Sequence, residues 1–264
     1  MFEQVENCDS ILLACVDVDE LKRQIAIGQM LSTLSEAERD RANAFRAALL
    51  RDRFIAGRFC LREILGNELN IPANEILFST EANGKPFITN STTHGGHFSF
   101  SRSQQYAVVG YAESNRIGVD TEFVRTLPDM DLMAAEIFDE EQLLEWNTLP
   151  QVEKPLSFYR AWTRKEAVVK VDGRGISEGV RKIEVPLGDI ATQVVDVTLP
   201  PCAPAGETVA TTVSLTQWQA NEGLVVSVAI EPGSKRRPAA FSDRTAERTG
   251  IHHGTAIRRV YFAD

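Results

Sequence analysis

The sequence predicts an α+β protein in which each half of the chain places helices before a group of strands. Two observations carry this prediction. Helical periodicity precedes runs of strand character in both halves, and the composition changes at Gly233. The expected units are an N-terminal α+β subdomain at 1–115, a C-terminal α+β subdomain at 116–232, and a basic tail at 233–264, either disordered or folded back through Val260, Tyr261 and Phe262.

The composition excludes several classes of protein. The 264 residues are 43% apolar and 25% charged, as in ordinary globular domains. No run of 18 apolar residues suggests a membrane span, and the N-terminus carries acids where a signal peptide carries bases. A formal charge of −9 argues against a nucleic-acid partner. Four scattered cysteines favour a reducing compartment, so we expect a cytoplasmic monomer without a membrane partner.

The first half opens with an alternating apolar run at Ile11 to Val18 that predicts a strand. A capping box begins at Ser35 and predicts a helix that packs through Ala42, Phe45 and Leu49. A second helix is expected from Arg51 to Leu65. Both helices are rich in arginine, which indicates either a solvated basic face or a few phosphate-binding side chains.

A turn and two strands follow these helices. The turn at Asn83 to Phe87 contains Lys85 and Pro86, and taken alone it predicts a surface loop. The apolar run Tyr106 to Tyr111 predicts one strand, and Ile117 to Glu122 (IGVDTE) predicts another. Asp120 and Glu122 lie two residues apart, so both carboxylates point to one face of an extended chain. They repel each other unless a cation lies between them.

A helix at Phe158 to Gly175 is expected to complete the site. Pro155 suits its first turn, and Gly173 occupies the position of a C-terminal cap. Trp162, Glu166 and Lys170 are spaced by four residues and therefore share one face. Glu166 would add a third carboxylate to an all-oxygen site suited to Mg²⁺.

The remaining C-terminal elements are less distinctive. Residues 129–146 predict one acidic helix that ends near Trp146. Apolar alternation predicts strands, and the tail has seven Lys/Arg against three Asp/Glu. The expected strands are Ile183 to Val185, Val194 to Leu199, Thr208 to Leu215 and Leu224 to Ile230.

The two motifs IGVDTE and WTRKEAVVK, about forty residues apart, together resemble the surfactin-type 4′-phosphopantetheinyl transferases. That family has G-[VI]-D-x-E followed by W-x-x-K-E-A/S-x-x-K, and every signature position is filled here. The resemblance implies two similar α+β subdomains related by a pseudo-twofold axis. It also implies an enzyme that transfers the 4′-phosphopantetheine of coenzyme A to a serine of an acyl or peptidyl carrier protein, with Mg²⁺, and releases adenosine 3′,5′-bisphosphate.

The same resemblance assigns roles to individual residues. Metal ligands would be Asp120, Glu122 and Glu166. Catalytic residues would be Glu166, as the base for the serine proton directly or through a water, and Lys170, which would neutralise phosphate charge. The coenzyme A contacts would be Arg41, Arg53, Lys85, Pro86, Ser101, Arg102 and Lys165, although Lys165 could equally be a surface residue.

One motif departs from the family pattern. Phe98 to Ser103 reads FSFSRS where relatives read F-N-x-S-H-S, so Ser99 replaces an asparagine and Arg102 replaces a histidine. Arginine can still hold phosphate in a fork, but it offers no neutral imidazole. Three alternatives therefore stay open: an internal salt-bridge network, a non-catalytic coenzyme A or carrier-binding relative, and an unrelated magnesium phosphohydrolase.

Overall fold

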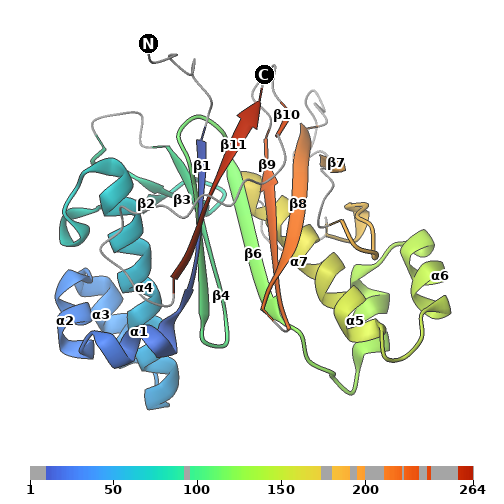
Figure 1. The fold of residues 1–264 in the computed structure, drawn as a ribbon, viewed down its shortest axis with the longest axis horizontal. Helices are drawn as coiled ribbons and strands as arrows, with labels where there is room; N and C mark the ends of the chain where they lie inside the picture. Colours follow the sequence, from blue (N-terminus) through green and yellow to red (C-terminus); the bar gives the residue numbers. More distant parts are fainter. Residues whose placement is uncertain are drawn as a thin grey trace, which may run out of the picture.

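The computed structural model describes residues 10–91, 96–173, 180–190, 195–199, 211–221, 223–231, 237–238 and 255–263. Two β-sheets lie at the centre of the molecule, and helices cover the outer side of each sheet (Figure 1). A core cluster between the sheets contains Ile11 and Val108 from one sheet with Val119, Val226 and Val228 from the other. The α+β prediction is confirmed.

The first sheet has the strand order β10-β11-β1-β5-β4. It comprises β1 (Ser10–Asp17), β4 (His97–Ser103), β5 (Tyr106–Ala112), β10 (Arg237–Pro238) and β11 (Thr255–Ala263). Its helices are α1 (Val18–Gln24), α2 (Ile27–Thr33), α3 (Glu36–Asn43) and α4 (Ala48–Leu69). A 3-10 turn (Ala73–Glu75) and the hairpin of β2 (Phe78–Thr80) and β3 (Pro86–Ile88) connect α4 to β4.

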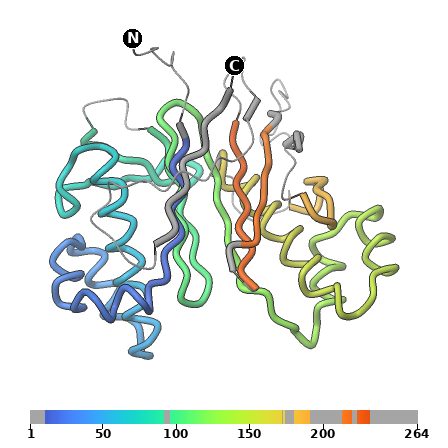
Figure 2. The backbone as a smooth tube through the Cα atoms, viewed as in Figure 1, coloured from blue at the N-terminus to red at the C-terminus, as the bar shows by residue number. Residues whose placement is uncertain are grey.

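The second sheet has the order β6-β9-β8-β7. It comprises β6 (Ile117–Phe123), β7 (Val195–Leu199), β8 (Thr211–Asn221) and β9 (Leu224–Ile230). Its helices are α5 (Met130–Ile137), α6 (Glu140–Thr148) and α7 (Lys154–Asp172), with a 3-10 turn at Val180–Lys182. The backbone trace shows both halves meeting along β4 and β6 (Figure 2).

Gly118 explains how closely α7 lies against β6. A Cβ atom at this position would come within 2.0 Å of the Ala167 carbonyl oxygen and 2.8 Å of the Val171 nitrogen. The helix can therefore cross β6 at this point only because residue 118 has no side chain. At the other end of this contact, Gly173 ends α7 in the left-handed conformation with φ +79°.

The predicted acidic helix at 129–146 is wrong in one respect, because the structure has two helices there. Phe138 is extended, with φ −93° and ψ 144°, and it is fully buried. Asp139 and Gln142 then form a capping box that starts α6. The burial of one aromatic ring and a new cap outweigh the continuous helical periodicity.

Two smaller expectations are also corrected. The helix that Ser35 caps ends at Asn43, and Leu49 is 54% exposed in α4 instead of packing with it. Ile183 and Val185 are buried, but they belong to no strand. Of the two alternatives for the tail from 233, the folded-back one has a counterpart in the structure, because β11 pairs with β1 from Thr255 to Tyr261.

Among the described helices, none combines the length and apolar composition of a membrane-spanning segment.

Candidate active site

The centre of the site is a group of three carboxylates on β6 and α7. Asp120 and Glu122 project from β6, and Asp120 is buried. Its Oδ1 atom accepts hydrogen bonds from Lys170 Nζ at 2.6 Å and from Ser101 Oγ at 2.7 Å. Glu122 accepts from Ser103 Oγ at 2.6 Å. Glu166, on the facing side of α7, is also buried.

Two oxygens of this group are unsatisfied. Within the described part of the chain, Asp120 Oδ2 and Glu166 Oε1 are buried without a hydrogen-bond partner. Burial, reinforced by the charge of Asp120, raises the pKa of Glu166 to about 7. Burial also raises the pKa of Glu122. Buried carboxylate oxygens that lack donors are the ligands that a hard cation such as Mg²⁺ prefers.

The carboxylates alone do not, however, form a complete set of metal ligands. Among the described residues, no group of three or more histidine, cysteine, aspartate or glutamate side chains is arranged to hold a metal ion. The chemistry of the donors fits Mg²⁺, whereas their spacing does not yet provide a complete ligand set. Among the described residues, Lys170 is the cation that pairs with Asp120.

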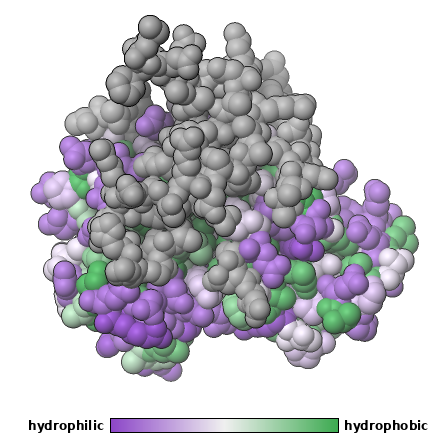
Figure 3. Space-filling view, in the orientation of Figure 1, coloured by the Kyte–Doolittle hydropathy of each residue, from purple (hydrophilic) through white to green (hydrophobic). Residues whose placement is uncertain are grey.

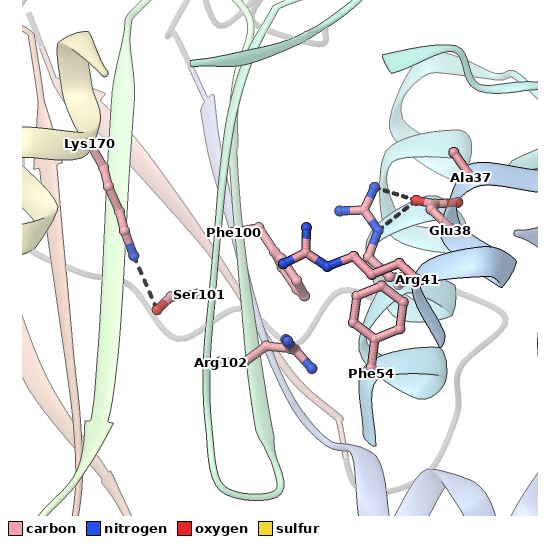
Figure 4. Close-up of a pocket in the computed structure, with 9 residues that line it drawn as sticks. Ala37, Glu38, Arg41, Phe54, Phe100, Ser101, Arg102 and Lys170 are labelled. Carbon is pink, nitrogen blue, oxygen red and sulfur yellow. Dashed lines mark hydrogen bonds and ion pairs between the residues drawn. The ribbon is translucent and has the colours of Figure 1, made fainter. Parts of the chain in front are cut away.

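Lys170 connects this centre to a cavity of about 570 Å³. Besides Asp120, its ammonium contacts Ser101 Oγ at 3.2 Å (Figure 4). It also contacts the Val119 carbonyl oxygen at 3.2 Å. The cavity lies between α3, α4 and β4 on one side and α7 on the other. Its lining is Ala37, Glu38, Arg41, Phe54, Arg58, Phe100, Ser101, Arg102 and Lys170.

The cavity carries an excess of positive charge. Arg58 is paired with Glu38, but in the described part of the chain neither Arg41 nor Arg102 has a carboxylate partner. Burial, together with the charges of Arg58 and Arg41, lowers the pKa of Arg102. Both unpaired guanidinium groups lie over the Phe54 ring, at 5.9 Å and 5.4 Å. Such a cavity favours an anion.

Gly57 makes room for Arg102 on α4. A Cβ atom at residue 57 would come within 2.7 Å of Arg102 Cδ and 3.4 Å of the Phe100 ring. The arginine stem therefore lies across the helix backbone, and its guanidinium group reaches into the cavity (Figure 4).

A second cavity, of about 400 Å³, extends the first toward the carboxylates. The two cavities share Arg58, Phe100 and Lys170. The lining of the second also contains Lys85, Pro86, Glu166 and Gly173, among others. The shared residues place the two cavities side by side, with the arginines on the first and Glu166 on the second.

Lys85 occupies a different position from the one expected of a surface residue. It is buried, and its ammonium donates to the Ile117 carbonyl at 2.8 Å and to the Lys170 carbonyl at 2.5 Å. The turn itself lies at the surface, because Asn83, Gly84, Pro86 and Phe87 are exposed, and within it only Lys85 is buried. The Lys85 side chain links the β2–β3 hairpin to β6 and α7, and Lys85 and Pro86 both line the second cavity.

Two predicted coenzyme A contacts lie outside the cavities. Arg53 donates to both carboxylate oxygens of Asp19, at 3.1 Å and 3.2 Å from Nε. Lys165 is fully buried, and its ammonium donates to the Val180 and Ile183 carbonyls at 3.1 Å and 2.8 Å. Neither the ligand role nor the surface role of Lys165 agrees with this burial. Burial lowers its pKa to about 8.

Arg58 and Phe54 are the residues that sequence reasoning missed. Both lie on α4, four residues apart, and therefore on one face of that helix. The basic face of this helix was interpreted as either solvated or phosphate-binding, and of its arginines only Arg53 was assigned a coenzyme A contact. The pattern of an aromatic residue, a glycine and an arginine at 54, 57 and 58 could have indicated a face that receives a neighbouring strand.

Fold and site together define a class of protein: an enzyme with an anion-binding cavity beside a carboxylate–lysine centre. Comparison with known proteins gives the family. Residues 116–229 match the 4′-phosphopantetheinyl transferase superfamily, and residues 23–115 match the N-terminal part of 4′-phosphopantetheinyl transferases. The chain belongs to the 4′-phosphopantetheinyl transferase superfamily.

Three relatives show how far this similarity extends. The 4′-phosphopantetheinyl transferase HetI of Nostoc sp. is 33% identical over 180 residues, which cover 68% of this chain and 75% of the relative. A putative 4′-phosphopantetheinyl transferase of Synechocystis sp. is 27% identical over 57% of this chain and 61% of its own length. The 4′-phosphopantetheinyl transferase Sfp of Bacillus subtilis is 26% identical over 56% of this chain and 64% of its own length.

Proposed function

We propose that this protein transfers the 4′-phosphopantetheine group of coenzyme A to a serine of an acyl or peptidyl carrier protein and releases adenosine 3′,5′-bisphosphate. One observation carries the proposal: a cavity with two arginines that have no carboxylate partner among the described residues shares Lys170 with a neighbouring cavity lined by the buried Glu166. Transferases of this name among the relatives support an enzyme over a non-catalytic binding protein.

The cavity suits coenzyme A in its charge and in its mixture of basic and apolar lining residues. Arg41 and Arg102 offer two guanidinium groups to phosphate oxygens, and each can form two parallel hydrogen bonds. Pro86 and Phe100 provide apolar surface between these arginines and Glu166. Arg102 therefore serves as a permanently charged phosphate contact, and Arg58 contributes less because Glu38 neutralises it.

Asp120, Glu122 and Glu166 would hold Mg²⁺. The unpaired oxygens of Asp120 and Glu166 are the donors that favour this assignment. When bound, the ion would neutralise pyrophosphate charge. Asp120 already binds one cationic group, the Lys170 ammonium, through its other oxygen.

The side chains provide the remaining chemistry. Attack of a serine hydroxyl on phosphorus needs removal of its proton and neutralisation of the leaving phosphate. Glu166, whose pKa burial raises to about 7, is the base. Lys170 is the cation at the leaving phosphate, because it lines both cavities and lies one helical turn from Glu166.

The decisive experiment is intact mass spectrometry of an apo carrier protein incubated with this protein, coenzyme A and Mg²⁺. We expect a mass gain of one phosphopantetheinyl group that disappears when EDTA is added. Absence of a gain on fatty-acid, polyketide and nonribosomal-peptide carriers would refute the transferase function. A gain that persists in EDTA would refute the metal dependence alone.

The role of Arg102 is tested separately by coenzyme A binding. We expect Arg102→Ala to weaken binding about 10-fold or more, because a charge-assisted phosphate contact is lost. Arg51→Ala, at an exposed position of the same helix as Arg58, should leave binding unchanged. Equal affinities of Arg102→Ala and the unaltered protein would remove Arg102 from the site.

Within the superfamily, we propose a surfactin-type enzyme that acts as a monomer in the cytoplasm. The motif IGVDTE with WTRKEAVVK supports the type, and four scattered cysteines support a reducing compartment.

A further inference from the structure

The outer edge of β6 is paired by side chains instead of by another strand. β6 is an edge strand of its sheet, and its unpaired side faces β4 of the other sheet. Backbone N–H and C=O groups of an edge strand need partners when they are buried. Here the partners come from a row of three serines on β4, Ser99, Ser101 and Ser103, which we call the serine row.

The serine row accepts successive N–H groups of β6. Val119 donates to Ser99 Oγ at 2.9 Å, Thr121 to Ser101 Oγ at 3.3 Å, and Phe123 to Ser103 Oγ at 3.0 Å. The offset between partners is always 20 residues, so β4 and β6 run parallel at this contact. Each serine thus takes the place of a backbone acceptor.

Two lysines complete the same edge from the carbonyl side. Lys85 donates to the Ile117 carbonyl and Lys170 to the Val119 carbonyl. The edge is therefore fixed by hydrogen bonds from the β2–β3 hairpin, from β4 and from α7.

Two members of the serine row also touch the carboxylates. Ser101 donates its hydroxyl proton to Asp120 Oδ1 at 2.7 Å, and Ser103 donates to Glu122 Oε2 at 2.6 Å. A hydroxyl has one proton and two lone pairs, and Ser101 uses all three with Asp120, Thr121 and Lys170. A saturated hydroxyl has one orientation, so it also fixes the carboxylate that it binds.

We propose that Ser101 and Ser103 are positioning residues, which aim the carboxylates of Asp120 and Glu122 while they fasten the edge of β6 to β4. The inference rests on the proposed function, in which these carboxylates hold Mg²⁺. Ser99 only fastens the edge of β6, because its hydrogen bond from the Val119 N–H involves no carboxylate.

The test measures metal affinity and backbone protection in the same variants. Mn²⁺, which takes the same oxygen ligands, is titrated by electron paramagnetic resonance with coenzyme A present and a protein-free titration subtracted. Amide hydrogen exchange is followed at Val119, Thr121 and Phe123. The variants are Ser101→Ala, Ser103→Ala, Ser103→Thr, which keeps the hydroxyl, and the matched control Ser99→Ala.

We expect Ser101→Ala and Ser103→Ala each to weaken Mn²⁺ binding about 10-fold, in the range of other hydrogen-bond partners of metal ligands. They should also speed exchange at Thr121 and Phe123, respectively. Ser103→Thr should restore the affinity, and Ser99→Ala should speed exchange at Val119 alone.

The two proposals fail differently. Unaltered Mn²⁺ affinity in both alanine variants, with binding intact in the unaltered protein, would overturn the positioning role alone. An equal loss of affinity in Ser99→Ala would also overturn it, because the effect would then come from the strand contact. Absence of Mn²⁺ binding in the unaltered protein would overturn the proposed metal site and the positioning role with it.

Discussion

Glu166 places a carboxylate where the fold would be more stable without its charge. It is buried, one oxygen has no partner in the described part of the chain, and Asp120 lies nearby. Buried polar groups that lack partners cost free energy of folding, and such costs concentrate at functional sites. The residue is therefore better explained by the reaction than by the stability of the protein.

The variant Glu166→Gln separates these two effects. We expect carrier modification to fall at least about 100-fold, because the amide can neither accept the serine proton nor bind a cation as strongly. In the absence of Mg²⁺, the free energy of unfolding should stay the same or rise, because repulsion with Asp120 is removed. Activity is measured by mass spectrometry and stability by urea unfolding.

The matched control for this variant is Glu141→Gln, at an exposed position of α6. It should change neither activity nor stability. Retained transfer in Glu166→Gln would exclude Glu166 as the base.

Asp19 and Arg53 form an ion pair outside the site, with a defined pH dependence. Hydrogen bonding from Arg53 lowers the pKa of Asp19 to about 2 from 3.8. Because the folded pKa is depressed, this pair stabilises the protein fully above pH 3.8, and the stabilisation is lost as pH falls toward 2. The pair is partly exposed, which limits its contribution to about 1 kcal/mol.

Asp19→Asn should therefore lower the free energy of unfolding by about 1 kcal/mol at pH 7 and by about half of that at pH 3. Urea unfolding at both pH values measures the difference. A deficit that is equal at pH 3 and pH 7 would show that the asparagine acts through packing and not through the lost charge.

At the scale of elements, the β6–α7 pair carries the centre of the site. The sequence indicated both elements and the shared face of Asp120 and Glu122, because alternation and helical spacing are local properties. It did not indicate that Gly118 sets their distance, since this depends on a helix that lies fifty residues further along the chain. The serine row was invisible for the same reason.

Gly118→Ala tests this close approach. The added methyl group would lie 2.0 Å from the Ala167 carbonyl oxygen, so β6 and α7 must separate. We expect a loss of at least about 3 kcal/mol in the free energy of unfolding, together with loss of activity.

Gly28→Ala is the matched control for the same substitution. A Cβ atom there would meet nothing within 4 Å, and the residue is in α2. Alanine has the higher helix propensity, so the variant should be unchanged or more stable by up to about 1 kcal/mol. Similar urea midpoints for both variants would refute the steric explanation.

At the scale of the whole molecule, the negative charge is unevenly distributed. Helices α5 and α6 carry five Asp/Glu and no Lys/Arg, whereas α3 and α4 balance six Asp/Glu with six arginines. The two groups of helices lie at opposite ends of the molecule, and hydrophilic residues cover much of both ends (Figure 3). The negative total charge therefore coexists with a cationic cavity. Composition argued against a nucleic-acid partner, but it could not locate this cavity, which exists only after α4 meets β4.

The C-terminal strand is the feature of the whole molecule that composition left undecided. Basic residues and weak periodicity allowed a disordered or a folded-back tail, because strand pairing depends on a partner, and the partner of β11 is β1, 239 to 251 residues away in sequence. Seven residue pairs join the two strands, from Ser10 with Tyr261 to Val16 with Thr255. Without β11, β1 would become a sheet edge.

Removal of residues 233–264 should therefore destabilise the N-terminal sheet. Residues Ile11 to Ala14 and Val16 of β1 are buried, and their backbone groups would lose the β11 ladder and face solvent or another chain. We expect a loss of at least about 2 kcal/mol in the free energy of unfolding and concentration-dependent self-association. Urea unfolding and light scattering measure the two effects.

Val260→Pro distinguishes strand pairing from the loss of basic charge. Residue 260 pairs with Ile11, and proline removes a backbone donor from the ladder while the length and charge of the chain stay the same. If pairing stabilises the sheet, this single change should reproduce most of the destabilisation caused by the truncation. If the truncated protein unfolds at the same urea concentration as the full chain, the strand contributes nothing to stability, and the alternative of a disordered tail is favoured instead.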